Sequence, residues 1–144
     1  MSRRCKPLQF LGFAAVLTLG ALGFTTSPVF AQITAVTIDP RGVIDQPGGA
    51  TVTVSGTLTC THGTNNLNVT VSQRRGQPPV KTAFGFTSLP CALTQPQPWI
   101  VAPRTSVGPL DPGPAIVEVT VINVGPDGGQ TADSASATVD LRPE

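Results

Sequence analysis

Strict alternation of side chains between Ala50 and Cys60 is the feature that most limits how this chain can fold. Apolar residues or glycine stand at every even position of this stretch, and threonine or serine stands at every odd position. Because successive side chains of a β-strand point to opposite faces of its sheet, the pattern predicts a strand with one buried and one exposed face. Cys60 falls on the predicted buried face.

Other runs in the chain repeat this two-residue period or have the length and composition of strands. They are Ile33–Ile38, Leu67–Ser72, Val80–Phe86, Trp99–Ala102, Pro114–Val124 and Ser134–Leu141. In the longest, Val117, Val119 and Val121 mark the inner face, while beyond Val121 the phase is ambiguous. No window of 11 residues has the apolar spacing of a helix. The chain is therefore predicted to be all-β, an antiparallel β-sandwich of about seven strands.

Glycine and proline mark where these strands end. Pro126-Asp127-Gly128-Gly129 predicts a hairpin between the last two strands, since proline pre-sets φ and glycine supplies a positive φ. Two longer proline-rich segments, Thr87–Pro98 and Pro103–Pro114, are predicted to be loops. No second domain boundary is found, so residues 32–144 are predicted to form one domain.

The first 31 residues have the layout of a secretory signal peptide. Basic residues at positions 3, 4 and 6 precede an apolar run from Leu8 to Phe24, and Pro28 and Ala31 follow. Cleavage is predicted between Ala31 and Gln32, which places the mature protein outside the cytoplasm, secreted or in the periplasm or cell envelope. The alternative is a retained anchor, but about 17 apolar residues is short for a bilayer. No later stretch is long enough to span a membrane.

Net charge offers no support for binding to nucleic acid. Cleavage would lower the number of basic residues from 9 to 6 against 8 acidic ones, which leaves a charge of −2. The densest basic cluster is Arg74-Arg75 with Lys81, and so small a group is typical of a solvated hairpin edge.

Two cysteines, Cys60 and Cys91, remain after the predicted cleavage. An even pair in an oxidising compartment predicts a disulfide, with two buried free thiols as the alternative. The bridge would tie the Thr87–Pro98 loop to the end of the Ala50–Cys60 strand.

The strand pattern resembles exported bacterial immunoglobulin-like modules. The resemblance lies in the threonine–valine alternation and in Leu110–Ala115 leading into a valine-rich strand, and it covers Ile33–Leu141. It is similar in particular to small secreted bacterial domains of uncharacterised function. Trp99 follows both cysteines and the chain has no tyrosine, so antibody-type hallmarks are missing. The resemblance supplies no functional residues.

No catalytic constellation or metal site is expected. His62 is the only histidine, and no carboxylate lies near it in sequence to orient its ring. Cys60, His62 and Cys91 are too few for a structural zinc site, and no Asp-x-Asp spacing marks a calcium loop. No cofactor is predicted.

Binding is the remaining class of function, and Trp99, Phe84 and His62 are the candidate contact residues. Core packing is the alternative for Trp99 and the phenylalanines, because a small domain needs its few aromatic residues inside. The sequence favours an exported, non-catalytic interaction module whose partner is a protein or a cell-wall polymer. The alternatives are a carbohydrate-directed domain, a small hydrolase using His62, or a structural envelope component with edge strands free to pair. It leaves the oligomeric state open.

Overall fold

Every regular element in the described part of the chain is a β-strand. The computed structural model describes residues 33–45, 48, 50–74, 80–91 and 95–144. The predicted signal peptide and its cleavage site lie outside these residues. The strands are β1 Ile33–Val36, β2 Arg41–Ile44, β3 Val52–Cys60, β4 Thr64–Gln73, β5 Lys81–Pro90, β6 Gln97–Val101, β7 Arg104–Thr105, β8 Gly113–Val124 and β9 Gln130–Pro143.

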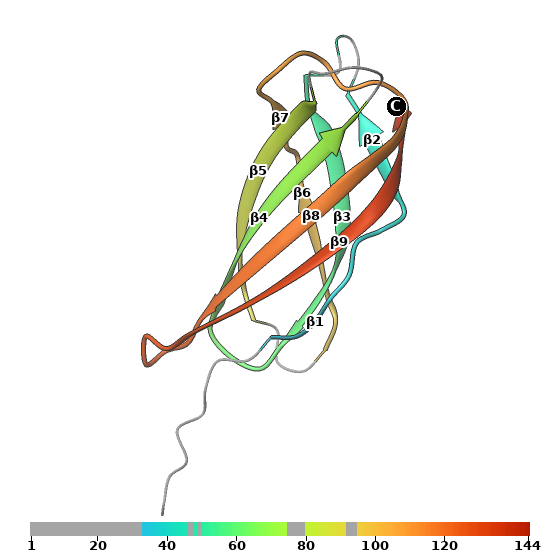
Figure 1. Ribbon diagram of the computed structural model, residues 1–144. Helices are drawn as coiled ribbons and strands as arrows, with labels where there is room; N and C mark the ends of the chain where they lie inside the picture. The colour runs from blue at the N-terminus through green and yellow to red at the C-terminus, as the bar shows by residue number, and fades with distance from the viewer. Residues whose placement is uncertain (1–32, 46–47, 49, 75–79, 92–94) are drawn as a thin grey trace, which may run out of the picture.

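Hydrogen bonding orders the strands as β1-β3-β2-β9-β8-β4-β5-β7, with β6 on β3. All neighbours are antiparallel except β2 and β9, which run parallel. In Figure 1, β3 and β6 lie behind the long strands β4, β8 and β9. The described residues thus form two layers, with β2 bonded to both β3 and β9.

The core lies between these layers and follows the predicted alternation. Every even-numbered residue of β3 from Val52 to Cys60 is buried. On β4 and β8, Leu67, Val69 and Val71 pair with Val121, Val119 and Val117, and all six are at most 1% exposed. The inner faces of β3, β4 and β8 predicted from sequence are therefore confirmed.

Close approach of the neighbouring segments to β3 requires glycine at position 56. A Cβ on Gly56 would lie 2.0 Å from the carbonyl oxygen of Thr37 and 2.6 Å from Cζ2 of Trp99. Trp99 pairs with Gly56 across β3 and β6, and its ring fills the space that a side chain would need.

Nine strands are found among the described residues instead of about seven. The predicted strand Ile33–Ile38 ends at Val36, and a separate strand, β2, begins after Pro40, which has no N–H to donate to a sheet. The short strand β7 is the second strand that the sequence did not predict. The hairpin at Pro126–Gly129 is confirmed: Gly128 has φ +82° and its N–H donates to the Gly125 carbonyl at 3.0 Å.

The prediction that Thr87–Pro98 is a loop was wrong for its first four residues. β5 continues to Pro90, paired with β4 along its whole length. Leu89 packs against the core there, and this contact explains the extension. β6 likewise begins at Gln97, before the predicted strand.

A disulfide joins Cys60, at the end of β3, to Cys91, just after β5, as predicted. The Cα atoms are 5.8 Å apart and the sequence separation is 31 residues. The bond connects the two layers at one end of the domain.

Replacing both Cys60 and Cys91 by serine should lower the free energy of unfolding by about 3–4 kcal/mol, since the bridge closes a long loop in the unfolded chain. Urea unfolding followed by Trp99 fluorescence measures this loss. Chemically reduced wild-type protein should behave like the double variant, and the exposed Ser136→Ala should behave like oxidised wild type. A loss below about 1 kcal/mol would contradict a stabilising role.

Candidate functional site

His62 lies in the short turn between β3 and β4, and this turn is fixed by its backbone. The His62 carbonyl accepts a hydrogen bond of 2.9 Å from Nδ2 of Asn123. Gly63 has φ +91°, and a Cβ there would lie 2.1 Å from the Val124 carbonyl oxygen. Within the described residues, no hydrogen bond or ion pair links the His62 ring to a carboxylate. Among the residues that the structure describes, the His62 ring therefore has no carboxylate partner of the kind that acid–base chemistry uses.

Two buried asparagines beside this turn were not predicted from the sequence. Asn65 on β4 and Asn123 on β8 stand opposite each other, and each has 0% exposure. Asn123 Nδ2 donates to Asn65 Oδ1 at 2.6 Å, and Asn65 Nδ2 donates to Cys60 Sγ at 3.2 Å. This buried polar group anchors the His62 turn and the disulfide to the main sheet. Position 123 is where the predicted phase of the strand became ambiguous.

Trp99 was proposed as a contact residue, and the structure corrects this. Its side chain is 2% exposed and belongs to the core. The position of Trp99 in the alternation of β6 directs its ring inward, against Gly56.

Phe84 has the opposite placement and is open to solvent. Phe84 is 56% exposed and Phe86 is 81% exposed, so neither follows the core-packing alternative. The inner position between them belongs to Gly85, where a Cβ would lie 2.7 Å from Val101 Cγ1. With no inner space for large side chains, β5 carries both rings on the outside.

The exposed side of the large sheet gathers these residues into one surface, which we call the outer face. Residues that stand opposite each other on neighbouring strands form rows, or rungs, across this face. In one such rung Phe84 is followed by Thr70, then Glu118, then Ser136. Its central rungs across β5, β4, β8 and β9 consist of Thr82, Ser72, Ile116, Thr138, Phe84, Thr70, Glu118, Ser136, Phe86, Asn68, Thr120 and Ser134. Among these twelve side chains Glu118 alone is charged.

Three hollows lie on this outer face. The largest, about 650 Å³, is lined by residues that include Ser72, Arg74, Ile116 and Glu118. A second, about 430 Å³, lies between β8 and β9 and shares Glu118. The third, about 220 Å³, lies between β4 and β5 and is lined by both phenylalanines.

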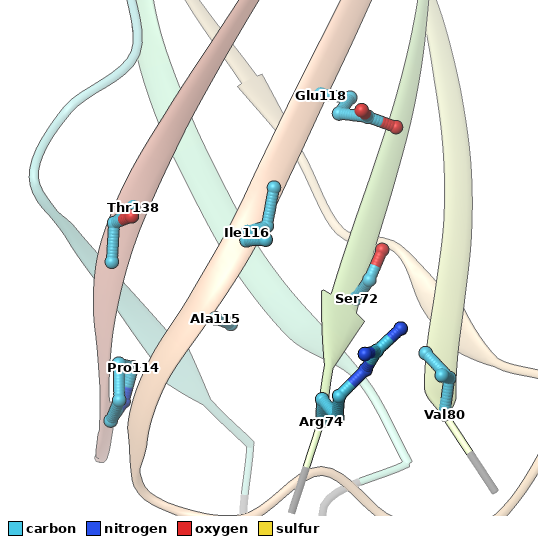
Figure 2. A pocket seen from close by; sticks show the side chains of 8 residues that line it. All are labelled: Ser72, Arg74, Val80, Pro114, Ala115, Ile116, Glu118 and Thr138. Atoms are coloured by element: carbon cyan, nitrogen blue, oxygen red, sulfur yellow. The ribbon is translucent and has the colours of Figure 1, made fainter. Parts of the chain in front are cut away.

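Figure 2 shows the largest hollow from close by. Ser72 lies between Glu118 and Arg74, while Ile116 and Val80 contribute apolar surface on either side. Ile116 is 51% exposed. The hollow thus brings together a carboxylate, a guanidinium group, hydroxyls and apolar side chains.

Sequence reasoning did not assemble this surface. The exposure of Ile116 could have been predicted, because Ile116 is next to the inward-facing Val117 and so points to the opposite side of the sheet. Arg74 was interpreted as a solvated hairpin residue, and Arg75 lies outside the described residues. In the described ranges, no group of three or more His, Cys, Asp or Glu is close enough to hold a metal ion. No helix within those ranges is long and apolar enough to cross a membrane.

A family model covers most of the chain. Residues 32–140 match the model described as "Family of unknown function (DUF6299)". The chain belongs to this family. The matched DUF6299 region contains the two cysteines, the buried asparagines and every outer-face residue named above.

Two further comparisons add little information about function. No curated protein matches the chain. Among solved structures, the chain is similar to AggA, the major subunit of aggregative adherence fimbriae type I from Escherichia coli. The TM-score is 0.40 with 11% sequence identity, and the match covers 79% of this chain and 95% of the other.

Asn123→Ala should lower the free energy of unfolding by about 1–3 kcal/mol, because it leaves the buried Asn65 amide oxygen and the His62 carbonyl without their donor. Asn68→Ala, an exposed change on β4, is the matched control and should stay within about 0.5 kcal/mol of wild type. Urea unfolding of the oxidised proteins measures both. Equal stability of the two variants would show that the buried amide pair contributes nothing.

Proposed function

We propose that this chain is an exported, non-catalytic interaction module and that the outer face is its contact surface. The observation that carries the proposal is the coincidence of the three hollows with exposed Phe84, Phe86 and Ile116 on one side of the sheet. Exposed apolar groups that cluster among polar ones are typical of interaction surfaces. The partner is a protein or a cell-wall polymer.

The architecture that we propose for this module is an immunoglobulin-like β-sandwich. The strand order supports it: β1 bonds to β3 in one layer, and β2 then runs parallel to β9 in the other. The β1–β2 segment thus contributes to both layers, and β4, β8 and β9 form the centre of the second layer.

Export is supported by two separate features. The first 31 residues have the pattern of a signal peptide, and Cys60 and Cys91 are joined by a disulfide. Disulfides of this structural kind persist mainly in oxidising compartments.

The alternative is a carbohydrate-directed domain, and the hollow between β4 and β5 favours it. Phe84 and Phe86 line this hollow together with Asn68 and Thr70, so two rings lie beside amide and hydroxyl groups. A sugar presents both apolar C–H surface and hydroxyls, which match that combination. The hydrolase version of this alternative needs a carboxylate partner for His62, which the geometry of the turn does not supply.

Ile116→Asp and Phe84→Asp should each reduce binding of the exported, oxidised protein to envelope preparations of its own cell by about tenfold or more, since each places a charge in the proposed contact surface. The matched control is Ile100→Asp: Ile100 is 66% exposed but lies on β6, in the other layer. It should bind like wild type. Co-sedimentation across a concentration series measures the binding.

Pretreatment of the envelope separates the two partner classes. Loss of binding after protease digestion would identify a protein, and binding that survives it would identify a polymer. Retention of a neutral polysaccharide in affinity electrophoresis, lost in Phe84→Asp, would favour the carbohydrate alternative. Equal loss in all three variants, or no loss in any, would contradict the outer face as the contact surface.

A further inference from the structure

Among the described residues, one edge of strand β5 is paired with another strand over only part of its length. On one side it pairs with β4 along all ten of its residues. On the other side it pairs only with β7, and only at Ala83 and Phe84. Toward its end, the carbonyl of Pro90 accepts a side-chain hydrogen bond of 3.0 Å from Gln97 Nε2.

The chain leaves this edge because it crosses between the layers at Pro103. Just before the crossing, Val101 pairs with Val54 on β3, in the other layer. Just after it, Arg104 pairs with Phe84 on β5. A Cβ on Gly85 would lie 2.9 Å from Pro103 Cα, so the crossing chain sits against Gly85. From Phe86 onward, β7 no longer covers β5.

The backbone groups at this edge follow from strand alternation. The N–H of Ser106 donates to the Thr82 carbonyl at 3.0 Å, so Thr82 directs its backbone groups away from β4. Backbone groups point to alternate sides along a strand, and the β4–β5 register has no shift. Phe86 and Ser88 therefore direct both N–H and C=O outward, and Pro90 directs its carbonyl outward.

Two other edges among the described strands carry features that oppose pairing, whereas β5 carries its one proline, Pro90, at its last residue. β1 has four residues and a register shift between Ile33 and Ala35, and the five-residue β6 contains Pro98. Such short, irregular or proline-bearing edges discourage association. From Thr82 to Pro90, by contrast, β5 has no charged residue.

We propose that a second copy of this chain pairs with this edge, β5 against β5 and antiparallel, about a two-fold axis at Ser88. In this register the N–H of each Ser88 donates to the carbonyl of the partner's Ser88. The N–H of Phe86 donates to the carbonyl of the partner's Pro90, an oxygen that also accepts the hydrogen bond from Gln97 Nε2 of its own copy. The Phe86 carbonyl faces the nitrogen of the partner's Pro90, which has no N–H to donate. The two large sheets then form one continuous sheet across the dimer.

A second copy fits this edge better than an arbitrary strand because the edge complements itself. With no charge between Thr82 and Pro90, self-pairing places no like charges opposite each other. Phe86, the most exposed of the large apolar side chains in the described chain at 81%, would pack beside the partner's Pro90. Phe86 belongs both to this edge and to the outer face, whereas Ser88 is not among the twelve central outer-face residues, so Ser88→Pro tests the pairing separately from ligand binding.

Sedimentation equilibrium of the full, exported and oxidised protein tests the proposal. Wild type should show a concentration-dependent monomer–dimer equilibrium. Ser88→Pro removes the central edge donor from both copies and should raise the dissociation constant by about tenfold or more. Ser88→Ala keeps the N–H and is the matched control, so it should dimerise like wild type.

A second variant guards against misfolding of the proline variant. Phe86→Lys leaves the β5 backbone intact but places a cation on the edge of each copy, and it should also weaken the dimer. A wild-type protein that stays monomeric to about 0.1 mM would overturn the proposal. So would a dimer that folded Ser88→Pro and Phe86→Lys both retain. Either result leaves ligand binding by the outer face untouched, because Ile116→Asp tests that surface alone.

Discussion

Burial of the valine rows on β4 and β8 is the constraint on which the rest of the structure depends. Val69 stands opposite Val119, with Val71–Val117 and Leu67–Val121 on either side, and all are buried. A slip of one residue would turn Thr70 and Glu118 inward and every valine outward. Because that exchange would bury a carboxylate and expose the core, the register of these central strands is strongly fixed, and β5 and β9 are aligned on them.

The same alternation of side chains along β4 and β8 determines which residues are exposed on the outer face. Once valines fill the inner positions, the outer positions of β8 are left to Ile116, Glu118 and Thr120. On β5 the large side chains also lie on the outer face, but for a different reason. The chain crossing at Pro103 leaves inner space for Gly85 only. The outer face and the open β5 edge are thus both consequences of how the core and the crossing are arranged. The contact surface that we propose lies on regular strands, which favours preorganised contact.

Much of this fold could be predicted from the sequence, and the limits have physical causes. Alternation in Ala50–Cys60 fixed both the strand and its inner face, and the cysteine count identified the disulfide. Alternation does not reveal which parity is buried when both contain apolar residues, so Phe84 and Trp99 could be assigned to opposite sides only from the structure. Nor could it place Asn65 and Asn123 in the interior, since a buried asparagine is acceptable only when another segment satisfies it. The outer face was missed because it joins two strand pairs, β4–β5 and β8–β9, that are distant from each other in sequence.

Amide hydrogen exchange tests the central claim about the valine rows most directly. In the oxidised protein, the slowest exchange should be found for residues 67–71 of β4 and 117–121 of β8, since these backbones are paired on both sides and can open only when the core opens. The four-residue strand β1, which pairs with β3 alone, should exchange much faster. If β8 exchanged as fast as β1, the valine rows would not be the element that holds this domain together.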